Sequence, residues 1–159
     1  MSDTTHSKRR RAARLAAVQA IYQMDVGEVS SQTVIREFQN HHFGGSDEIG
    51  YVEADEEFFI DLVHGVIEFQ DNIDNEISDH LTKNWRLSRI DKTLRSLMRA
   101  GVYELSRRPD VPALVIIDQY VSIAVDFFDD KEAGFVNGII EKIAKKIRQA
   151  EFGIVGENT

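Results

Sequence analysis

Residues 90–105 read IDKTLRSLMRAGVYEL, and their spacing predicts the class of the fold. Apolar or small residues recur at intervals of three and four, as on one face of an α-helix, at Ile90, Leu94, Leu97, Gly101 and Leu105. The preceding segment from Ser88 to Asp91 fits a capping box, in which a hydroxyl and an acid bind the free amides of a helix start. The interspersed cations predict an amphipathic core helix with a basic outer face, ended by Arg107-Arg108-Pro109.

Apolar residues recur at helical spacing on both sides of this segment as well. Further helices are expected over residues 9–26, from Ser30 through Phe38, over 55–83 with a break near Asn72, from Pro112 to Phe128, and from Phe135 to Ile147. Residues 113–117 alone could form a strand, but their helical continuation and the lack of partner strands favour a helix. Residues 40–54 lack periodicity and are predicted to form a loop. We therefore expect an all-α protein.

The composition agrees with a helical globular chain of 159 residues. Hydrophobic residues make up 42 % of it, enough for a core, while two prolines and ten glycines are too few for a many-turned β-sandwich or barrel. No apolar run approaches the ~20 residues of a membrane-spanning helix, so no membrane role is expected. The absence of cysteine excludes disulfides and thiolate zinc sites, and suits a reducing cytoplasm.

Charge is distributed in blocks along the chain, whose formal net charge is −8. Residues 47–79 carry twelve acids and no Lys or Arg, which is usually a solvated face. Residues 1–24 instead carry one acid, Asp3, and five cations, namely Lys8, Arg9, Arg10, Arg11 and Arg14. A guanidinium group can bind a phosphate through two parallel hydrogen bonds and can stack on a base, so this arginine-rich helix start could anchor RNA. A frayed, solubilising N-terminus explains the charge pattern equally well.

Catalysis and metal binding find little support in the sequence. A di-iron bundle needs two Glu-x-x-His motifs, whereas the chain offers a single Asp61-x-x-His64. No phosphate-binding loop, nucleophile elbow or His-Glu-x-x-His motif is present. We expect no catalytic residue, metal or cofactor.

Several blocks of residues follow one another in a recognisable order. They are RRAAR (10–14), AVQAIYQMD (17–25), FIDLVHGV (59–66), WRL (85–87), MRAGVYEL (98–105), DQYVSIA (118–124) and FVNG (135–138). In order and spacing these blocks resemble the NusB family of bacterial transcription antitermination factors, over about residues 8–148. The chain departs from the family at Asp118-Gln119, where Asn-Glu is common.

The resemblance implies a fold and a function. The fold is two three-helix bundles packed into one compact domain. Proteins of this family bind the boxA element of nascent ribosomal RNA together with NusE, a small ribosomal-subunit protein, and help RNA polymerase avoid premature termination. The RNA-binding role then falls on Arg9, Arg10, Arg11, Arg14 and Phe135, and the protein-partner side on Tyr22, Arg99 and Tyr103.

The expected organisation is a flexible arm over residues 1–8, a helical domain over 9–150 and a tail over 151–159. The resemblance allows a monomer or a homodimer. The same fold forms the N-terminal domain of a ribosomal RNA methyltransferase, but 159 residues leave no room for a cofactor-binding domain, so a free-standing protein is expected. Two alternatives stay open: a helical scaffold without specific RNA binding, and a NusB-like domain in ribosomal RNA maturation.

Overall fold

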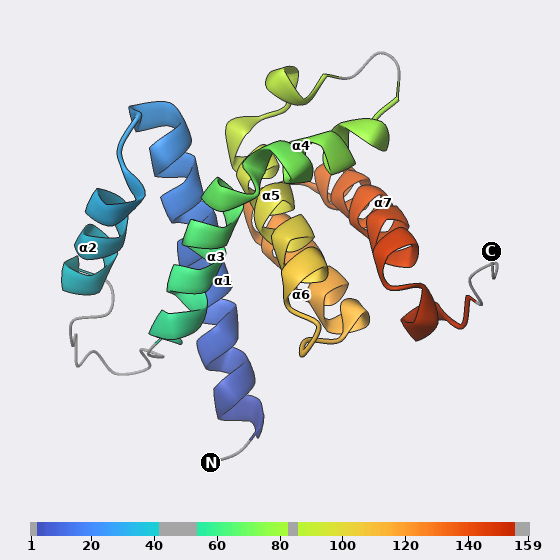
Figure 1. Cartoon of the computed structure of the whole chain (residues 1–159), viewed down its shortest axis with the longest axis horizontal. Helices are drawn as coiled ribbons and strands as arrows, with labels where there is room; N and C mark the ends of the chain where they lie inside the picture. The colour runs from blue at the N-terminus through green and yellow to red at the C-terminus, as the bar shows by residue number, and fades with distance from the viewer. Residues whose placement is uncertain (1–2, 42–53, 83–85, 155–159) are drawn as a thin grey trace. The chain divides into compact units, whose positions relative to one another are not determined.

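The computed structural model describes residues 3–41, 54–82 and 86–154. Every regular element within these ranges is a helix (Figure 1). The helices fall into two compact units, residues 1–68 and residues 69–159. The all-α prediction is confirmed, whereas most of the predicted loop 40–54 and the aromatic residue Trp85 lie outside the described residues.

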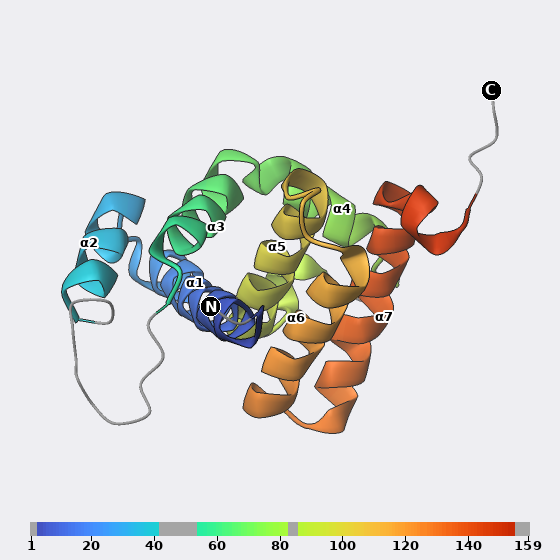
Figure 2. The same ribbon diagram turned by 90° about the horizontal axis from the view of Figure 1, so that it is seen from below.

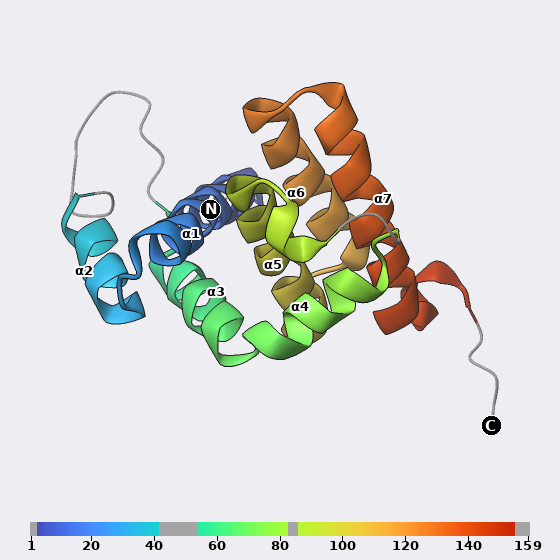
Figure 3. The ribbon, with the colours of Figure 1, turned by 90° about the horizontal axis from the view of Figure 1, so that it is seen from above.

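The first unit is a three-helix bundle of α1 (Asp3–Gly27), α2 (Ser31–His41) and α3 (Glu56–Glu68). Each helix packs on the other two, and Figure 3 shows α2 beside α1 and α3. α1 begins six residues before the predicted start at residue 9, so residues 3–8 of the expected flexible arm are helical. Residues 8–13 are all Lys, Arg or Ala, which have high helix propensity, so extending the helix through them costs little free energy.

Side-chain caps fix the starts of α2 and α3. The Ser30 hydroxyl accepts a hydrogen bond from the Thr33 amide at 3.2 Å, as the residue that caps a helix start does. The Asp55 carboxylate accepts one from the Phe58 amide at 3.1 Å. Between the helices, the rings of Phe38 and Phe59 pack with centroids 5.3 Å apart in the core.

The predicted long helix over 55–83 is broken at Phe69. That residue leaves the helical backbone and separates α3 from α4 (Gln70–Asp79), three residues before the expected break. The apolar stripe continues across the break, which is why its spacing alone predicted one helix. Its members belong to two cores, because Leu62 and Val66 are buried in the first unit, and Ile73 and Ile77 in the second.

The second unit contains a further three-helix bundle, against which α4 packs. Its helices are α5 (Lys92–Arg107), α6 (Ala113–Phe127) and α7 (Asp130–Ile147), with short 3-10 helices η1 (Leu87–Arg89) and η2 (Gln149–Phe152). Figure 2 shows α6 and α7 running side by side from the short turn that joins them. α7 begins five residues earlier than predicted, with Asp130 and Glu132 in its first turn, where the helix dipole favours acids.

α5 is the central helix of the second unit, and this overturns two predictions. Its expected basic outer face is largely absent, since Arg95 and Arg99 are buried where α4, α6 and α7 surround the helix. The predicted capping box is also wrong. Ser88 lies in η1, and Asp91 caps α5 by accepting from the amides of Thr93 and Leu94 at 2.9 and 3.1 Å.

A close approach of α5 to α6 and α7 depends on Gly101. A Cβ atom at this position would lie 3.0 Å from Ile140 Cδ1 and 3.3 Å from Tyr120 Cγ. Next to it, the Tyr120 hydroxyl donates to the carboxylate of the fully buried Glu104 at 2.8 Å. This hydrogen bond partners a buried acid that would otherwise be costly in the core.

Candidate functional site

The arginines at the start of α1 differ in their surroundings. The guanidinium carbons of Arg10 and Arg14 lie 4.5 and 5.0 Å from the centroid of the Phe58 ring. Arg10 also lies 3.6 Å from the Asp55 carboxylate, measured from Nε to Oδ2. The contacts draw both side chains onto α3, because a guanidinium is attracted to an aromatic face and to a carboxylate.

Burial separates Arg14 from the other candidate RNA ligands. Arg14 is 2 % exposed, so it is a core residue of the first unit rather than a phosphate-binding side chain. The family resemblance assigns Arg14 to the RNA-binding residues, and the sequence alone does not show which face of α1 is covered. Arg9, Arg10 and Arg11 are half-buried and retain solvent access.

Phe135 lies in the second turn of α7, half-buried, rather than at the helix start. It lines a cavity of about 220 Å³ between α7 and the η1–α5 segment. Exposed cations flank the cavity, Arg89 from η1 and Lys131 from α7. Its other lining residues are Ile90, Asp91, Leu94 and Glu132. An aromatic ring, apolar side chains and two cations together can accept a planar base and its phosphates.

The proximity of Arg89 and Lys131 to Phe135 was not predicted from the sequence. They come from segments more than 40 residues apart, and only the packing of α5 on α7 brings them together. Both cations lie at or just before the start of a predicted helix, Arg89 before residues 90–105 and Lys131 before Phe135. The sequence does not indicate that these two helix starts lie next to each other.

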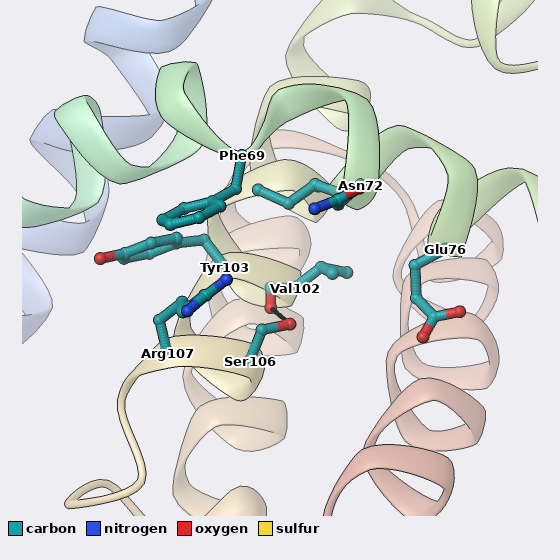
Figure 4. Close-up of a pocket in the computed structure, with 8 residues that line it drawn as sticks. Phe69, Asn72, Glu76, Val102, Tyr103, Ser106 and Arg107 are labelled. Carbon is teal, nitrogen blue, oxygen red and sulfur yellow. Dashed lines mark hydrogen bonds between the residues drawn. The ribbon is translucent and has the colours of Figure 1, made fainter.

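A second cavity, of about 240 Å³, lies between α4 and α5. Figure 4 shows the rings of Phe69 and Tyr103 stacked on one side of it and Glu76 on the other. The ring centroids are 6.4 Å apart, and the Arg107 guanidinium carbon lies 3.8 Å from the Phe69 centroid. The lining is completed by Asn72, Ile73, Val102 and Ser106. We call these eight residues the α4–α5 groove.

The α4 side of this groove contains one acid, Glu76, on a helix that is acidic overall. α4 carries four acids and no Lys or Arg, namely Asp71, Asp74, Glu76 and Asp79. Glu76 accepts a hydrogen bond from Lys146 of α7 at 2.7 Å, and this bond, with the charge of Glu76, raises the pKa of Lys146. The groove thus combines stacked aromatic rings with one carboxylate, Glu76, and one cation, Arg107.

The predicted protein-partner residues do not share one environment. Tyr103 lines the α4–α5 groove but is only 5 % exposed. Arg99 is 6 % exposed and forms a two-point ion pair with Asp74, at 2.8 and 2.9 Å, so its evident role is to join α5 to α4. Tyr22 belongs to the other unit, where it is 37 % exposed on α1.

No group of three or more metal-ligating side chains occurs among the described residues. None of the helices in the described ranges is long and apolar enough to cross a membrane.

A family model described as the NusB family matches residues 11–145. The chain belongs to the NusB family. Its similarity extends to curated relatives named transcription antitermination protein NusB. The relative from Maricaulis maris (strain MCS10) is 47 % identical over 144 residues, covering 90 % of each chain. The relative from Rhodopseudomonas palustris (strain HaA2) is 46 % identical over 147 residues, covering 92 % of this chain and 87 % of the other.

Solved structures of NusB proteins share the fold. T. maritima NusB superposes with a TM-score of 0.75 at 28 % identity, covering 91 % of this chain and 97 % of that one. A NusB chain from a complex of NusB and NusE with double-stranded RNA gives a TM-score of 0.70 at 24 % identity, covering 87 % and 98 %.

Proposed function

We propose that this NusB family member is an RNA-binding transcription antitermination factor. It binds boxA of nascent ribosomal RNA together with NusE, and the complex helps RNA polymerase avoid premature termination. The support is the 46–47 % identity to curated antitermination proteins over nearly the whole chain. A structural relative that forms a complex with NusE and double-stranded RNA is consistent with these partners. We place this role in the bacterial cytoplasm and assign no catalytic step to it.

The observation that carries RNA binding is the Phe135 cavity in the second unit. Half-buried Phe135 offers a ring on which an unpaired base can stack, and Ile90 and Leu94 supply the apolar wall. Arg89 and Lys131, which also line the cavity, can bind the phosphates that flank such a base. Stacking on an aromatic side chain contributes about 1–3 kcal/mol per base in single-stranded RNA complexes.

The start of α1 supplies a second RNA contact within the first unit. Arg9 and Arg11 bind phosphates, while Arg10 combines phosphate binding with its contacts to Asp55 and Phe58. Arg14 acts indirectly by fixing α1 on α3.

The α4–α5 groove is the docking surface for the protein partner. The net negative charge of α4, with Glu76 in the groove, complements a basic ribosomal protein. Tyr103 with Phe69 forms an aromatic wall against which the aliphatic part of a Lys or Arg side chain can pack. Arg99 supports this surface by holding α4 through Asp74.

Fluorescence anisotropy with labelled boxA RNA, with and without NusE, tests the function. We expect boxA to bind more tightly than a scrambled RNA, and NusE to tighten boxA binding about five- to 150-fold, since coupling between two ligands is typically 1–3 kcal/mol. Equal binding of both RNAs in the presence of NusE would instead favour a helical scaffold without specific RNA binding.

A further inference from the structure

Arg148, the residue after α7, binds the carbonyls at the end of α5. Its Nε donates to Leu105 O at 2.8 Å, and its Nη2 donates to Arg108 O at 2.8 Å and to Glu104 O at 3.4 Å. Its Nη1 donates to Val111 O at 2.9 Å. The last carbonyls of a helix lack partners within the helix, and the guanidinium supplies donors there. Glu104 O and Arg108 O also accept backbone amides, from Arg108 and Val111, so Arg148 adds a second donor to each of them.

Glu151 makes the complementary contact at the start of α6. Its Oε1 accepts from the amide of Ala113, the first residue of α6, at 2.8 Å. Pro112 precedes this amide and makes no side-chain cap. Glu151 Oε2 also binds Arg148 Nη1 at 2.6 Å. A cation therefore lies at the C-terminus of α5 and an anion at the N-terminus of α6, as both helix dipoles favour.

These contacts fix the turn of α5 that forms one wall of the α4–α5 groove. Ser106 and Arg107 line the groove, and they lie between the carbonyls that Arg148 binds. If this turn frayed, Arg107 would leave the face of Phe69. Helix ends held by few apolar contacts open locally at low cost, so their geometry depends on such capping contacts.

Resting on the proposed function, we propose that Arg148 and Glu151 form a latch that holds the end of α5 in the geometry that binds the protein partner. Arg148 is a positioning residue, because it acts through Ser106 and Arg107. The latch adds little to the core, since none of the four residues of η2, where Glu151 lies, is buried. Its loss should loosen residues 104–113 while leaving the bundle folded.

The test compares Arg148→Gln with Arg148→Lys and with the control Lys145→Gln in the full chain. Lys145 is an exposed cation near the same end of α7, paired with Glu141 rather than with α5. Hydrogen exchange of the amides in 104–113 reports the latch, and calorimetry reports binary affinity for NusE and for boxA RNA.

We expect Arg148→Gln to accelerate exchange in 104–113 and to weaken NusE binding about tenfold, as when only a tenth of molecules stay binding-competent. RNA affinity and helical content should be unchanged, because a general loss of folding would lower both affinities together. Arg148→Lys keeps the charge but loses the planar guanidinium group with its several donors, so its exchange rate and NusE affinity should lie between those of Arg148→Gln and the wild type. Lys145→Gln should match the wild type in both measurements. If Arg148→Gln fails to fold, Glu151→Ala, which removes the acceptor of the Ala113 amide, carries the same expectation.

Unchanged exchange in 104–113 would overturn the latch. Faster exchange with unchanged NusE affinity would overturn its link to the groove. If the wild-type chain itself did not bind NusE, the partner assignment of the proposed function would fail, and the exchange measurement would still decide whether the latch exists.

Discussion

Arg14 stacks on Phe58, with its guanidinium carbon 5.0 Å from the ring centroid and the arginine only 2 % exposed. This pair joins α1 to α3 at the arginine-rich start of α1. The basic cluster therefore contains one buried arginine that packs in the first unit, and three arginines that keep solvent access.

Replacing Arg14 with alanine should destabilise the first unit. A desolvated cation–π contact is worth about 2 kcal/mol, and Arg14→Ala also removes packing against Phe58. We expect the free energy of unfolding to fall by about 2 kcal/mol or more in urea denaturation. Lys8→Ala, which removes an exposed cation from the same helix, should leave it within about 0.5 kcal/mol. Equal stability of the two variants would contradict a structural role for Arg14.

Removing the accessible arginines should change the salt dependence of RNA binding rather than stability. Each phosphate contact to single-stranded RNA contributes about 0.7 to the slope of log affinity against log salt. The double variant Arg9→Ala/Arg11→Ala should therefore lower this slope by up to about 1.4 in an anisotropy titration over several salt concentrations. An unchanged slope would show that neither side chain contacts phosphate.

Two helical glycines should respond oppositely to alanine. At Gly101 a Cβ would meet Tyr120 and Ile140, whereas at Gly138 it would meet no atom within 4 Å beyond the neighbouring residues and backbone of its own helix. Both changes gain helix propensity, but only Gly101→Ala overpacks the core, which typically costs about 1–3 kcal/mol. We expect Gly101→Ala to be less stable than Gly138→Ala by that difference, measured by chemical denaturation. A smaller difference would mean that the core between α5 and α7 relaxes freely.

Glu151 should make stability depend on pH at the acid end. Its hydrogen bond from the Ala113 amide, followed by that from Arg148, lowers its pKa below the ordinary value of 4.5. The unfolded chain therefore takes up this proton more readily than the folded chain. The stabilisation is complete above about pH 4.5 and is lost as the pH falls through the folded pKa. Thermal melts from pH 7 to pH 3 should show Glu151→Gln losing less stability than the wild type on acidification; parallel losses would contradict the contact.

Helical periodicity was enough to predict the all-α class and most of the helices. The helix starts expected at Ser30 and Asp55 agree with the structure, because both are residue types that cap helices and both side chains accept a hydrogen bond from an amide of the first turn. The break at Phe69 was displaced, since one apolar stripe serves two cores. The capping box at Ser88 was wrong because the competing cap at Asp91 has the same local sequence signal.

The candidate site was less predictable because it depends on tertiary packing. The charge pattern identified the arginine cluster but not the burial of Arg14, which depends on Phe58 from α3. Arg99 carries a charge and was assigned to a surface, although its ion pair with Asp74 allows it to be buried. Phe135 was assigned through the family resemblance. Its cationic neighbours Arg89 and Lys131 could be identified only from the folded structure.

Binding of an RNA base in the Phe135 cavity is tested most directly by the affinity of Phe135→Ala for boxA RNA. The matched control is Phe127→Ala, which removes a 44 % exposed phenylalanine at the end of α6. At about 1–3 kcal/mol per stacked base, Phe135→Ala should weaken binding about five- to 150-fold, with circular dichroism unchanged and Phe127→Ala like the wild type. Wild-type affinity of Phe135→Ala for boxA RNA, with and without NusE, would contradict the account.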